Sequence, residues 1–328
     1  MTGKPIALDY TVRPFQWADL AAVAALYNAA AEADGEMHRV TVDALEREWS
    51  VDHFDAERDI VVVTLPDGQI IGAAYVEWED DPVTFADCEV HPDFRGLGVG
   101  EALLTLTEHR ALERADAAMP DAPSINLDRV TLDGNEAAIG LYTRHGYSHV
   151  RTYYVMKILL ESPVEEPPLP EGVELRPFDR QRDVRAVYDA HAETFTDHWS
   201  YHMLPYEEWV ELVLNRPECA NAGEEWLVAW AGDQIAGICL NRRIANDPQA
   251  AWTMVVGVRR EWRKRGLAYA LLRRTFSLYQ RKGFREAALA VDSSSLTNAV
   301  ALYERAGMHV SLRRLLFRKP LRGELSLD

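Results

Sequence analysis

The chain has 328 residues, of which 48% are hydrophobic and 27% charged, a composition typical of a globular protein long enough for two domains. Its net charge of −17 disfavours nucleic acid and anionic membranes as partners, so we expect neither. Because no run of 18 apolar residues and no apolar N-terminal core is present, we expect no membrane span or signal peptide and a cytoplasmic protein. Three dispersed cysteines, Cys88, Cys219 and Cys239, favour a reducing compartment without disulfides, and no residue cluster suggests a metal site.

The first half predicts a regular alternation of helices and strands. In chain order these are an amphipathic helix opened by Arg13-Pro14-Phe15, a hairpin of strands at 60–64 and 69–72, a strand at about 84–90, a helix, a strand at about 124–132 and a short helix that ends at Gly146. The turn Pro66-Asp67-Gly68 is a hairpin signal. A glycine four residues past Tyr142 has the spacing of a helix C-cap.

The second half repeats this pattern, so the chain is an internal duplication. Its copy opens at Arg176-Pro177-Phe178 and predicts strands at 226–230, 234–237, about 252–258 and about 286–292, then a short helix that ends at Gly307. Between the copies, residues 161–170 hold four prolines and three acids, which favours a linker. We therefore expect an N-terminal domain at 1–160, a linker at 161–172 and a C-terminal domain at 173–328.

The most informative repeat is a loop between a strand and a helix, at Val90–Gly100 and again 168 residues later at Val258–Ala268. Both copies contain Arg-x-x-Gly-x-Gly/Ala. The first amide groups of a helix lack intrahelical partners, and glycines let the backbone approach an anion closely, so such a loop is a phosphate site. The cluster Arg259, Arg260, Arg263, Lys264 and Arg265 beside the second loop suits a ligand with several phosphates.

These motifs resemble the GNAT superfamily of acyl-CoA-dependent N-acyltransferases. The resemblance covers nearly the whole chain and includes Asn135-x-x-Ala138-x-x-Leu141-Tyr142-x-x-x-Gly146 in the first half and Ala299-x-x-Leu302-Tyr303-x-x-x-Gly307 in the second. It implies an α/β fold (α+β, with a mixed sheet) in two tandem domains, and transfer of an acetyl group from acetyl-CoA to the amine of a small molecule by direct attack in a ternary complex. In this superfamily the sheet splays between its fourth and fifth strands to admit the thioester.

The resemblance also assigns roles to residues. CoA binding falls on Val90, His91, Arg95, Gly96, Leu97, Gly98, Val99, Gly100 and Asn135 in the first half and on Val256, Val258, Arg263, Lys264, Arg265, Gly266, Leu267 and Ala268 in the second. Tyr142 and Tyr303 are the candidates that protonate the leaving thiolate, because a phenol with a pKa of about 10 still carries its proton at neutral pH.

The general base is harder to assign. Asp87 and Glu89 lie on the strand before the first loop and alternate with Cys88, so they share one face of the sheet, where they are either surface acids or the base. We select Glu89. The second half has no carboxylate in Trp252-Thr253-Met254-Val255-Val256. Three candidates for its base stay open: Asp292, an unspecified residue near the first helix of that half, and bulk water.

The acceptor site of this superfamily usually lies at the loop after the first helix. In the second half that loop is dense in aromatic and polar residues, so we predict substrate contacts from Asp197, His198, Trp199, Tyr201 and His202. A hydrophobic plug is the other interpretation of the same loop. This loop and the basic cluster slightly favour the second half for catalysis, and either half could hold CoA.

Other functions stay open at this stage. The tandem layout also resembles the mycothiol synthase family, which acetylates a sugar-linked cysteine amine and carries a glutamate where this chain has Trp252. The missing second-half carboxylate also fits a non-catalytic acyl-CoA-binding module, and a duplicated structural protein with empty loops is a third interpretation. The sequence does not indicate the oligomeric state.

Overall fold

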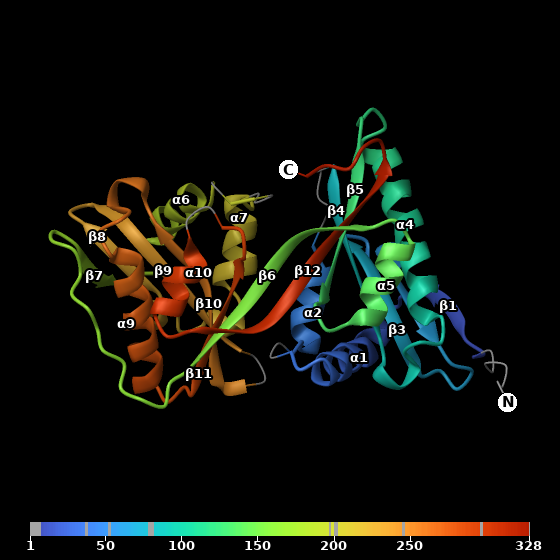
Figure 1. Ribbon diagram of the computed structural model, residues 1–328, viewed down its shortest axis with the longest axis horizontal. Helices are drawn as coiled ribbons and strands as arrows, with labels where there is room; N and C mark the ends of the chain where they lie inside the picture. The colour runs from blue at the N-terminus through green and yellow to red at the C-terminus, as the bar shows by residue number, and fades with distance from the viewer. Residues whose placement is uncertain are drawn as a thin grey trace. The chain divides into compact units, whose positions relative to one another are not determined.

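The computed structural model describes residues 8–36, 39–51, 54–77, 82–196, 198–199, 203–244, 247–295 and 298–327 (Figure 1). Its contacts divide the chain into two compact units. Unit 1 contains residues up to Arg151 together with Arg314–Leu327, and unit 2 contains Thr152–Arg313. Each unit has a mixed sheet with helices packed against it, so the predicted α/β fold with two tandem domains is confirmed.

The sheet of unit 1 has the strand order β1-β2-β3-β4-β5-β12. Its elements in chain order are β1 (Thr11–Pro14), η1 (Trp17–Asp19), α1 (Leu20–Ala33), α2 (Val42–Trp49), α3 (Ala56–Asp59), β2 (Ile60–Thr64), β3 (Ile70–Glu77), β4 (Val83–Val90), η2 (Pro92–Phe94), α4 (Val99–Ala118), β5 (Ile125–Leu132), α5 (Glu136–Arg144) and the start of β6 (Ser148–Leu159). All neighbouring strands are antiparallel except β4 and β5, which run parallel.

Unit 2 repeats this arrangement with the strand order β7-β8-β9-β10-β11-β6 and a parallel β10–β11 pair. Its elements are β7 (Glu174–Pro177), α6 (Val184–Phe195), α7 (Tyr206–Trp209), η3 (Val210–Leu214), η4 (Pro217–Cys219), α8 (Ala222–Glu225), β8 (Leu227–Ala231), β9 (Gln234–Ile244), β10 (Asp247–Val258), η5 (Arg260–Trp262), α9 (Leu267–Arg281), β11 (Glu286–Asp292), α10 (Ala299–Arg305) and the start of β12 (His309–Arg322). Residues 160–173, which contain the predicted linker, form no helix or strand.

The last strand of each half continues into the other unit. Residues 153–159 of β6 pair with β11 in unit 2, and residues 314–322 of β12 pair with β5 in unit 1. The sequence contained no sign of this exchange, because the pattern of a strand does not specify which neighbour it will pair with. As a result, unit 1 is complete only when the C-terminal end of the chain is present.

The apolar residues of β2 and β3 build a core on both faces of the unit 1 sheet. Ile60, Val62 and Ala73 pack with α1 and α2. Residues on the other face of the sheet, such as Val63, pack with α4. Gly72 allows this second contact, because a Cβ atom there would lie 2.8 Å from Val99 Cγ1. The start of α4 can therefore sit directly on the sheet.

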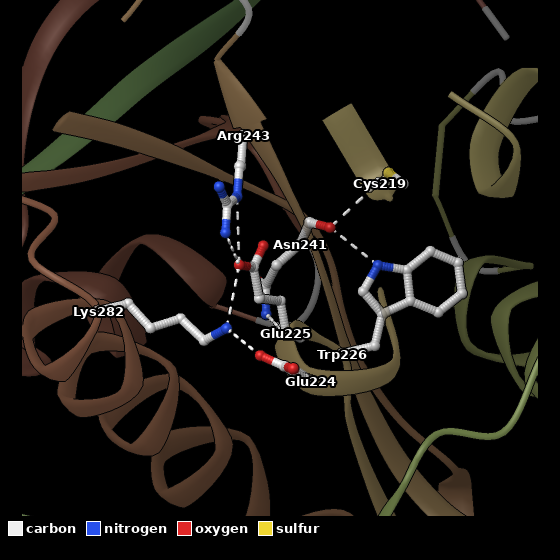
Figure 2. A network of polar contacts seen from close by, with 7 residues as sticks. All are labelled: Cys219, Glu224, Glu225, Trp226, Asn241, Arg243 and Lys282. Atoms are coloured by element: carbon white, nitrogen blue, oxygen red, sulfur yellow. Dashed lines mark hydrogen bonds and ion pairs between the residues drawn. The ribbon is translucent and has the colours of Figure 1, made fainter. Parts of the chain in front are cut away.

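A buried polar network fixes the strands of unit 2 to its helices (Figure 2). Asn241 Nδ2 donates to the Glu225 carbonyl at 2.6 Å, and Trp226 Nε1 donates to the Asn241 carbonyl at 2.8 Å. The Glu225 carboxylate, which is only 2% exposed, receives Arg243 Nη2 at 2.8 Å and Lys282 Nζ at 3.4 Å. Because every charged group here has a partner, we assign the network a structural role.

Most predicted elements form where the sequence placed them, including both hairpins and the glycines that end α5 and α10, Gly146 (φ +83°) and Gly307 (φ +100°). Helices α2, α3, α7 and α8 and strands β1, β6, β7 and β12 were not predicted. Cys88, Cys219 and Cys239 are free thiols. Within the described ranges, no helix combines the length and apolarity needed to span a membrane.

The ion pair between Asp128 on β5 and Arg318 on β12 should stabilise unit 1 strongly. It is bidentate, with O–N distances of 2.7 and 2.8 Å, and Arg318 is 0% exposed. We expect Asp128→Ala to lower the free energy of unfolding by about 3 to 5 kcal/mol, because it leaves a buried charge without its partner. Urea denaturation measures this. The matched control, Asp189→Ala in the exposed Arg185–Asp189 pair, should change stability by no more than about 0.5 kcal/mol, and equal effects would contradict the prediction.

Candidate active site

An opening between two parallel strands defines the site in each unit. In unit 1, β4 and β5 pair only at Val83–Phe85 with Asn126–Asp128, so the rest of β4 has no strand partner on that side. In unit 2, β10 and β11 pair only at Ala250–Trp252 with Glu286–Ala288. Each opening leads toward the loop that the sequence predicted as a phosphate site.

The loop of unit 1 has the backbone geometry of an anion site. Gly96 and Gly98 have φ angles of +77° and +86°, and α4 begins directly after them at Val99. Among the described residues, no atom lies within 4 Å of the position that a Cβ would take at either glycine. The amides of residues 96–100 have no hydrogen-bond acceptor among the described residues, so several N–H groups are available to one anion.

Two arginine contacts hold this loop in shape. Arg95 Nε donates to the Val90 carbonyl at 3.2 Å, and its guanidinium forms a bidentate pair with Asp34 at 2.6 and 2.9 Å. The amide of His91 donates to the Ile71 carbonyl at 2.9 Å. The Arg95 side chain therefore braces the loop against the end of α1.

The unit 2 loop reproduces the contacts that the first loop makes with backbone carbonyls. Arg263 Nε donates to the Val258 carbonyl at 3.1 Å, and Gly266 has a φ of +81°. Lys264 takes the place of Gly96 and has a φ of +63°, a conformation that costs a non-glycine residue roughly 1–2 kcal/mol. The nearby cations are partly engaged, since Arg259 Nε pairs with Glu193 at 2.7 Å and Arg265 stacks 4.6 Å from the Trp262 ring centre.

The two acids of β4 lie on the face of the unit 1 sheet that α1 covers, rather than facing solvent. Asp87 pairs across the strands with Tyr75 and Glu89 with Ala73, which packs under α1. Burial, together with the Asp87 carboxylate, raises the pKa of Glu89 to about 9. Burial also raises the pKa of Asp87. With a pKa near 9, the Glu89 carboxyl group carries a proton at neutral pH.

A second polar group lies on the opposite face, beneath α4 and α5. It contains Cys88 from β4, Tyr142 from α5 and Arg129 from β5. Burial and the neighbouring Cys88 raise the pKa of Tyr142 well above its usual value, while the positive charge of Arg129 opposes this rise. Burial raises the pKa of the Cys88 thiol to about 11. The opening thus has carboxylates on one face and a protonated phenol on the other.

Unit 2 has apolar groups or glycine at most of the matching positions. The strand registers align Asp87 with Val255, Glu89 with Gly257 and Arg129 with Leu289. A Cβ at Gly257 would lie 2.4 Å from Thr194 Oγ1, so no larger side chain fits there without a shift. Tyr303 occupies the place of Tyr142, and burial raises its pKa.

The predicted acceptor loop of unit 2 is only partly described. His198 stacks on Phe195 with ring centres 4.2 Å apart, and Trp199 is half-buried. Asp197, Tyr201 and His202 lie outside the described residues. The loop borders His191, whose Nδ1 accepts from Trp209 Nε1 at 3.0 Å. Burial and the neighbouring His198 lower the pKa of His191 to about 4, so this imidazole is neutral.

Several predicted CoA residues make contacts inside the fold. The Asn135 side chain caps α5 by accepting from the Ala138 amide at 3.1 Å. Val99 and Leu267 are 1% exposed and belong to the cores, whereas Leu97 is 44% exposed. Arg129 was not predicted as a site residue, although two consecutive charged residues, Asp128 and Arg129, in the middle of a strand were a usable signal.

Splayed parallel strands that lead to an amide-lined loop at a helix start define an acyl-CoA-dependent acyltransferase unit, and this chain has two. Sequence comparison agrees: the model of the Acetyltransferase (GNAT) family matches residues 21–147 and 184–308. The chain belongs to this family and is an N-acetyltransferase.

Individual relatives match over almost the whole length. Mycothiol acetyltransferase from Thermobispora bispora is 31% identical over 304 residues, covering 88% of this chain and 92% of the relative. The protein of the same name from Geodermatophilus obscurus is also 31% identical, with coverage of 94% and 96%. Among solved structures, a GCN5-related N-acetyltransferase from Sphaerobacter thermophilus is 34% identical, with a TM-score of 0.79 and coverage of 96% and 97%. A tandem GNAT protein from the clavulanic acid biosynthesis pathway shares the fold, with a TM-score of 0.72 at 15% identity and coverage of 97% and 100%.

The two loops can be tested separately with Gly98→Glu and Gly266→Glu. Each should weaken CoA binding to its own unit at least about 100-fold, because the new carboxylate would meet the pyrophosphate and like charges in contact cost several kcal/mol. Calorimetric titration with CoA counts the sites. Gly68→Glu is the control, since Gly68 has the same backbone strain (φ +89°) and open surroundings but lies in the β2–β3 turn. If the wild type bound no CoA, both loops would be wrongly assigned.

Proposed function

We propose that the protein transfers the acetyl group of acetyl-CoA to the amine of a small molecule, and that unit 1 carries out the reaction. One observation carries this proposal: the β4–β5 opening has two half-buried carboxyl groups on one face of the sheet and a protonated phenol on the other. The sequence alone slightly favoured unit 2 for catalysis. Unit 1 is favoured because unit 2 has apolar groups or glycine at the positions that match Asp87, Glu89 and Arg129.

The unit 1 loop fits the pyrophosphate of CoA. Its free amides supply donors, and the open space beside Gly96 and Gly98 admits phosphate oxygens. The edge of β4 that faces the opening leaves backbone groups available beyond Phe85, which fits the amides of a pantetheine arm. When bound, acetyl-CoA supplies the acetyl group as a thioester.

Two residues of this chain then handle the protons. Glu89 accepts a proton from the acceptor amine, whose nitrogen forms a bond to the acetyl carbon as the carbon–sulfur bond breaks. Tyr142 holds a proton on Oη and gives it to the leaving sulfur. The raised pKa of Tyr142 keeps this proton in place at neutral pH. Because Glu89 and Tyr142 lie on opposite faces of the sheet, the acceptor and the thiol enter from different sides.

The acidic groups on the α1 face favour a cationic acceptor. Asp87, Glu89 and Glu36 bring acidic groups to it, and Glu36 also pairs with Arg314 from β12. Tyr27 Oη is buried there without a hydrogen-bond partner in the described part of the chain and can accept from or donate to a ligand. A group that arrives as an ammonium ion, loses one proton to water and gives the next to Glu89 during attack matches this set.

A cysteinyl amine is a second candidate acceptor, favoured by the mycothiol acetyltransferases that are 31% identical over most of this chain. In the mycothiol synthase family the second half supplies a glutamate at the position of Trp252. Here Trp252 stacks with Arg242 at 5.7 Å. A reaction on a cysteinyl amine would therefore use unit 1 in this protein.

Conservative substitutions test the assignment of the acid and the base. We expect Glu89→Gln and Tyr142→Phe each to lower kcat by about 10² to 10⁴, the usual contribution of a general base or acid, with little change in CoA affinity. Steady-state kinetics on a panel of small amines measures this. The matched variant Tyr303→Phe in unit 2 should leave kcat within about twofold of wild type, and a larger loss there than in Tyr142→Phe would move catalysis to unit 2.

The raised pKa of Glu89 also predicts the effect of pH. Only ionised Glu89 accepts a proton, so kcat/KM should rise about tenfold per pH unit and level off near pH 9. Glu89→Gln should retain only the titration of the amine itself. The folded state binds this proton more tightly than the unfolded chain, so its contribution to stability is complete below pH 4.5 and is lost as pH rises through about 9. The melting temperature of the wild type should therefore fall relative to Glu89→Gln over that range, and parallel curves would contradict the prediction.

A further inference from the structure

Arg129 is a buried cation beside the opening of unit 1. It follows Asp128, the last β5 residue that pairs with β4, and it is 0% exposed. Its Nε donates to Tyr147 Oη at 2.8 Å, and its Nη2 donates to Thr107 Oγ1 and to the Leu104 carbonyl. Its Nη1 is buried and has no hydrogen-bond partner in the residues described.

Unlike the nearby Arg318, Arg129 forms no ion pair with a carboxylate among the described residues. Arg318 is equally buried but forms a bidentate pair with Asp128. The hydrogen-bond acceptors of Arg129 are a phenol, a hydroxyl and a carbonyl, all of them uncharged. A buried guanidinium without a carboxylate in contact is costly, so its retention needs a reason.

Unit 2 shows that the fold itself does not need this cation. The position of Arg129 is taken by Leu289 (2% exposed) and that of Tyr147 by Met308, while the threonine of α4, Thr107, has its equivalent in Thr275 of α9. The same packing therefore forms around an apolar side chain. The cation is present only in the unit that also has the paired carboxylates.

The ring of Tyr142 is the functional group that Arg129 faces. The guanidinium carbon lies 6.0 Å from the centre of that ring and 5.5 Å from the centre of the Tyr147 ring. Other charged and titratable groups around Tyr142 are Cys88, Asp87 and Glu89 from β4. Glu108 from α4 and Lys319 from β12 lie beside the neighbouring Tyr147 instead. Lys319 is itself paired with Glu108 at 2.8 Å, which leaves Arg129 as the cation that acts most directly on this phenol.

We propose that Arg129 is a positioning residue that stabilises the negative charge shared by Tyr142 and the departing sulfur. This inference rests on the proposed function of unit 1. As the carbon–sulfur bond breaks, the sulfur takes the proton of Tyr142 Oη, and the O–H bond is replaced by an S–H bond. The negative charge left on Tyr142 Oη faces the Arg129 guanidinium until a proton from water restores the phenol. Arg129 thereby makes a strongly buried tyrosine a usable acid.

The test measures the ionisation of the CoA thiol when it is bound, without any turnover. The Gly266→Glu variant serves as background, so that CoA occupies unit 1 alone, and the ultraviolet absorbance of the thiolate is followed against pH. Desulfo-CoA gives the baseline from the protein's own groups. We expect Arg129→Leu, which copies Leu289, to raise the pKa of the bound thiol by about one unit. Arg129→Lys should keep it close to that of the parent.

A control separates charge from structure. Tyr147→Phe removes the hydrogen bond that orients Arg129 but leaves its charge, so it should shift the thiol pKa less than Arg129→Leu does. If Tyr147→Phe and Arg129→Leu gave equal shifts, Arg129 would be only a packing residue. An unchanged thiol pKa in Arg129→Leu would also overturn the proposal. Should Arg129→Leu fail to fold, Arg129→Met provides an uncharged side chain of similar length.

Kinetics provides a second readout. Arg129→Leu should lower kcat about tenfold with KM unchanged, and it should have no further effect in a Tyr142→Phe background, because the charge acts through that phenol. A full additional loss in that background would overturn the inference. Failure of the proposed function gives a different result: the wild type acetylates no amine, yet Arg129→Leu still raises the pKa of the bound thiol.

Discussion

The pairing of β4 with β5 ends after three residues, and the proposed function of unit 1 depends on where it stops. Up to Phe85 the two strands form an ordinary parallel ladder. Beyond it, β4 keeps its bonds to β3 but has a free edge toward β5. A free edge in the middle of a sheet is costly unless something else pairs with it, and in the proposed function the amides of a pantetheine arm take this place. The same separation lets side chains from both faces of the sheet approach one point.

Two nearly identical scaffolds carry different interiors. Both units have the splayed strands, the arginine that bonds to its own loop, and a tyrosine near the end of the short helix that follows the opening. Only unit 1 surrounds its opening with Asp87, Glu89 and Arg129, whereas unit 2 has Val255, Gly257 and Leu289. In a duplicated protein, both copies can keep the same backbone fold while one of them no longer has the polar side chains that a reaction needs. The exchanged strands β6 and β12 give unit 2 a structural reason to persist, because each unit is completed by a strand that continues from the other half of the chain.

The electrostatics of the opening follow from burial. In water, Glu89 would be ionised and a poor base, and Tyr142 would have an ordinary phenol pKa. Desolvation raises the pKa values of both groups. In the proposed reaction this suits Glu89 for accepting a proton and would make Tyr142 too weak an acid on its own. A cation beside the phenol and a second carboxylate beside the base adjust the two groups in opposite directions.

The sequence by itself determined the duplication, the order of most elements and the two phosphate loops, because glycine spacing and apolar periodicity are local properties that a few residues encode. It also placed Asp87 and Glu89 on one face of a strand. Only the tertiary structure decided that this face is buried under α1, that Arg129 lies beside Tyr142, and that the last strands change units. These depend on contacts between residues far apart in the chain, such as Asp128 with Arg318, and alternation along a strand shows which residues share a face without showing what will cover it.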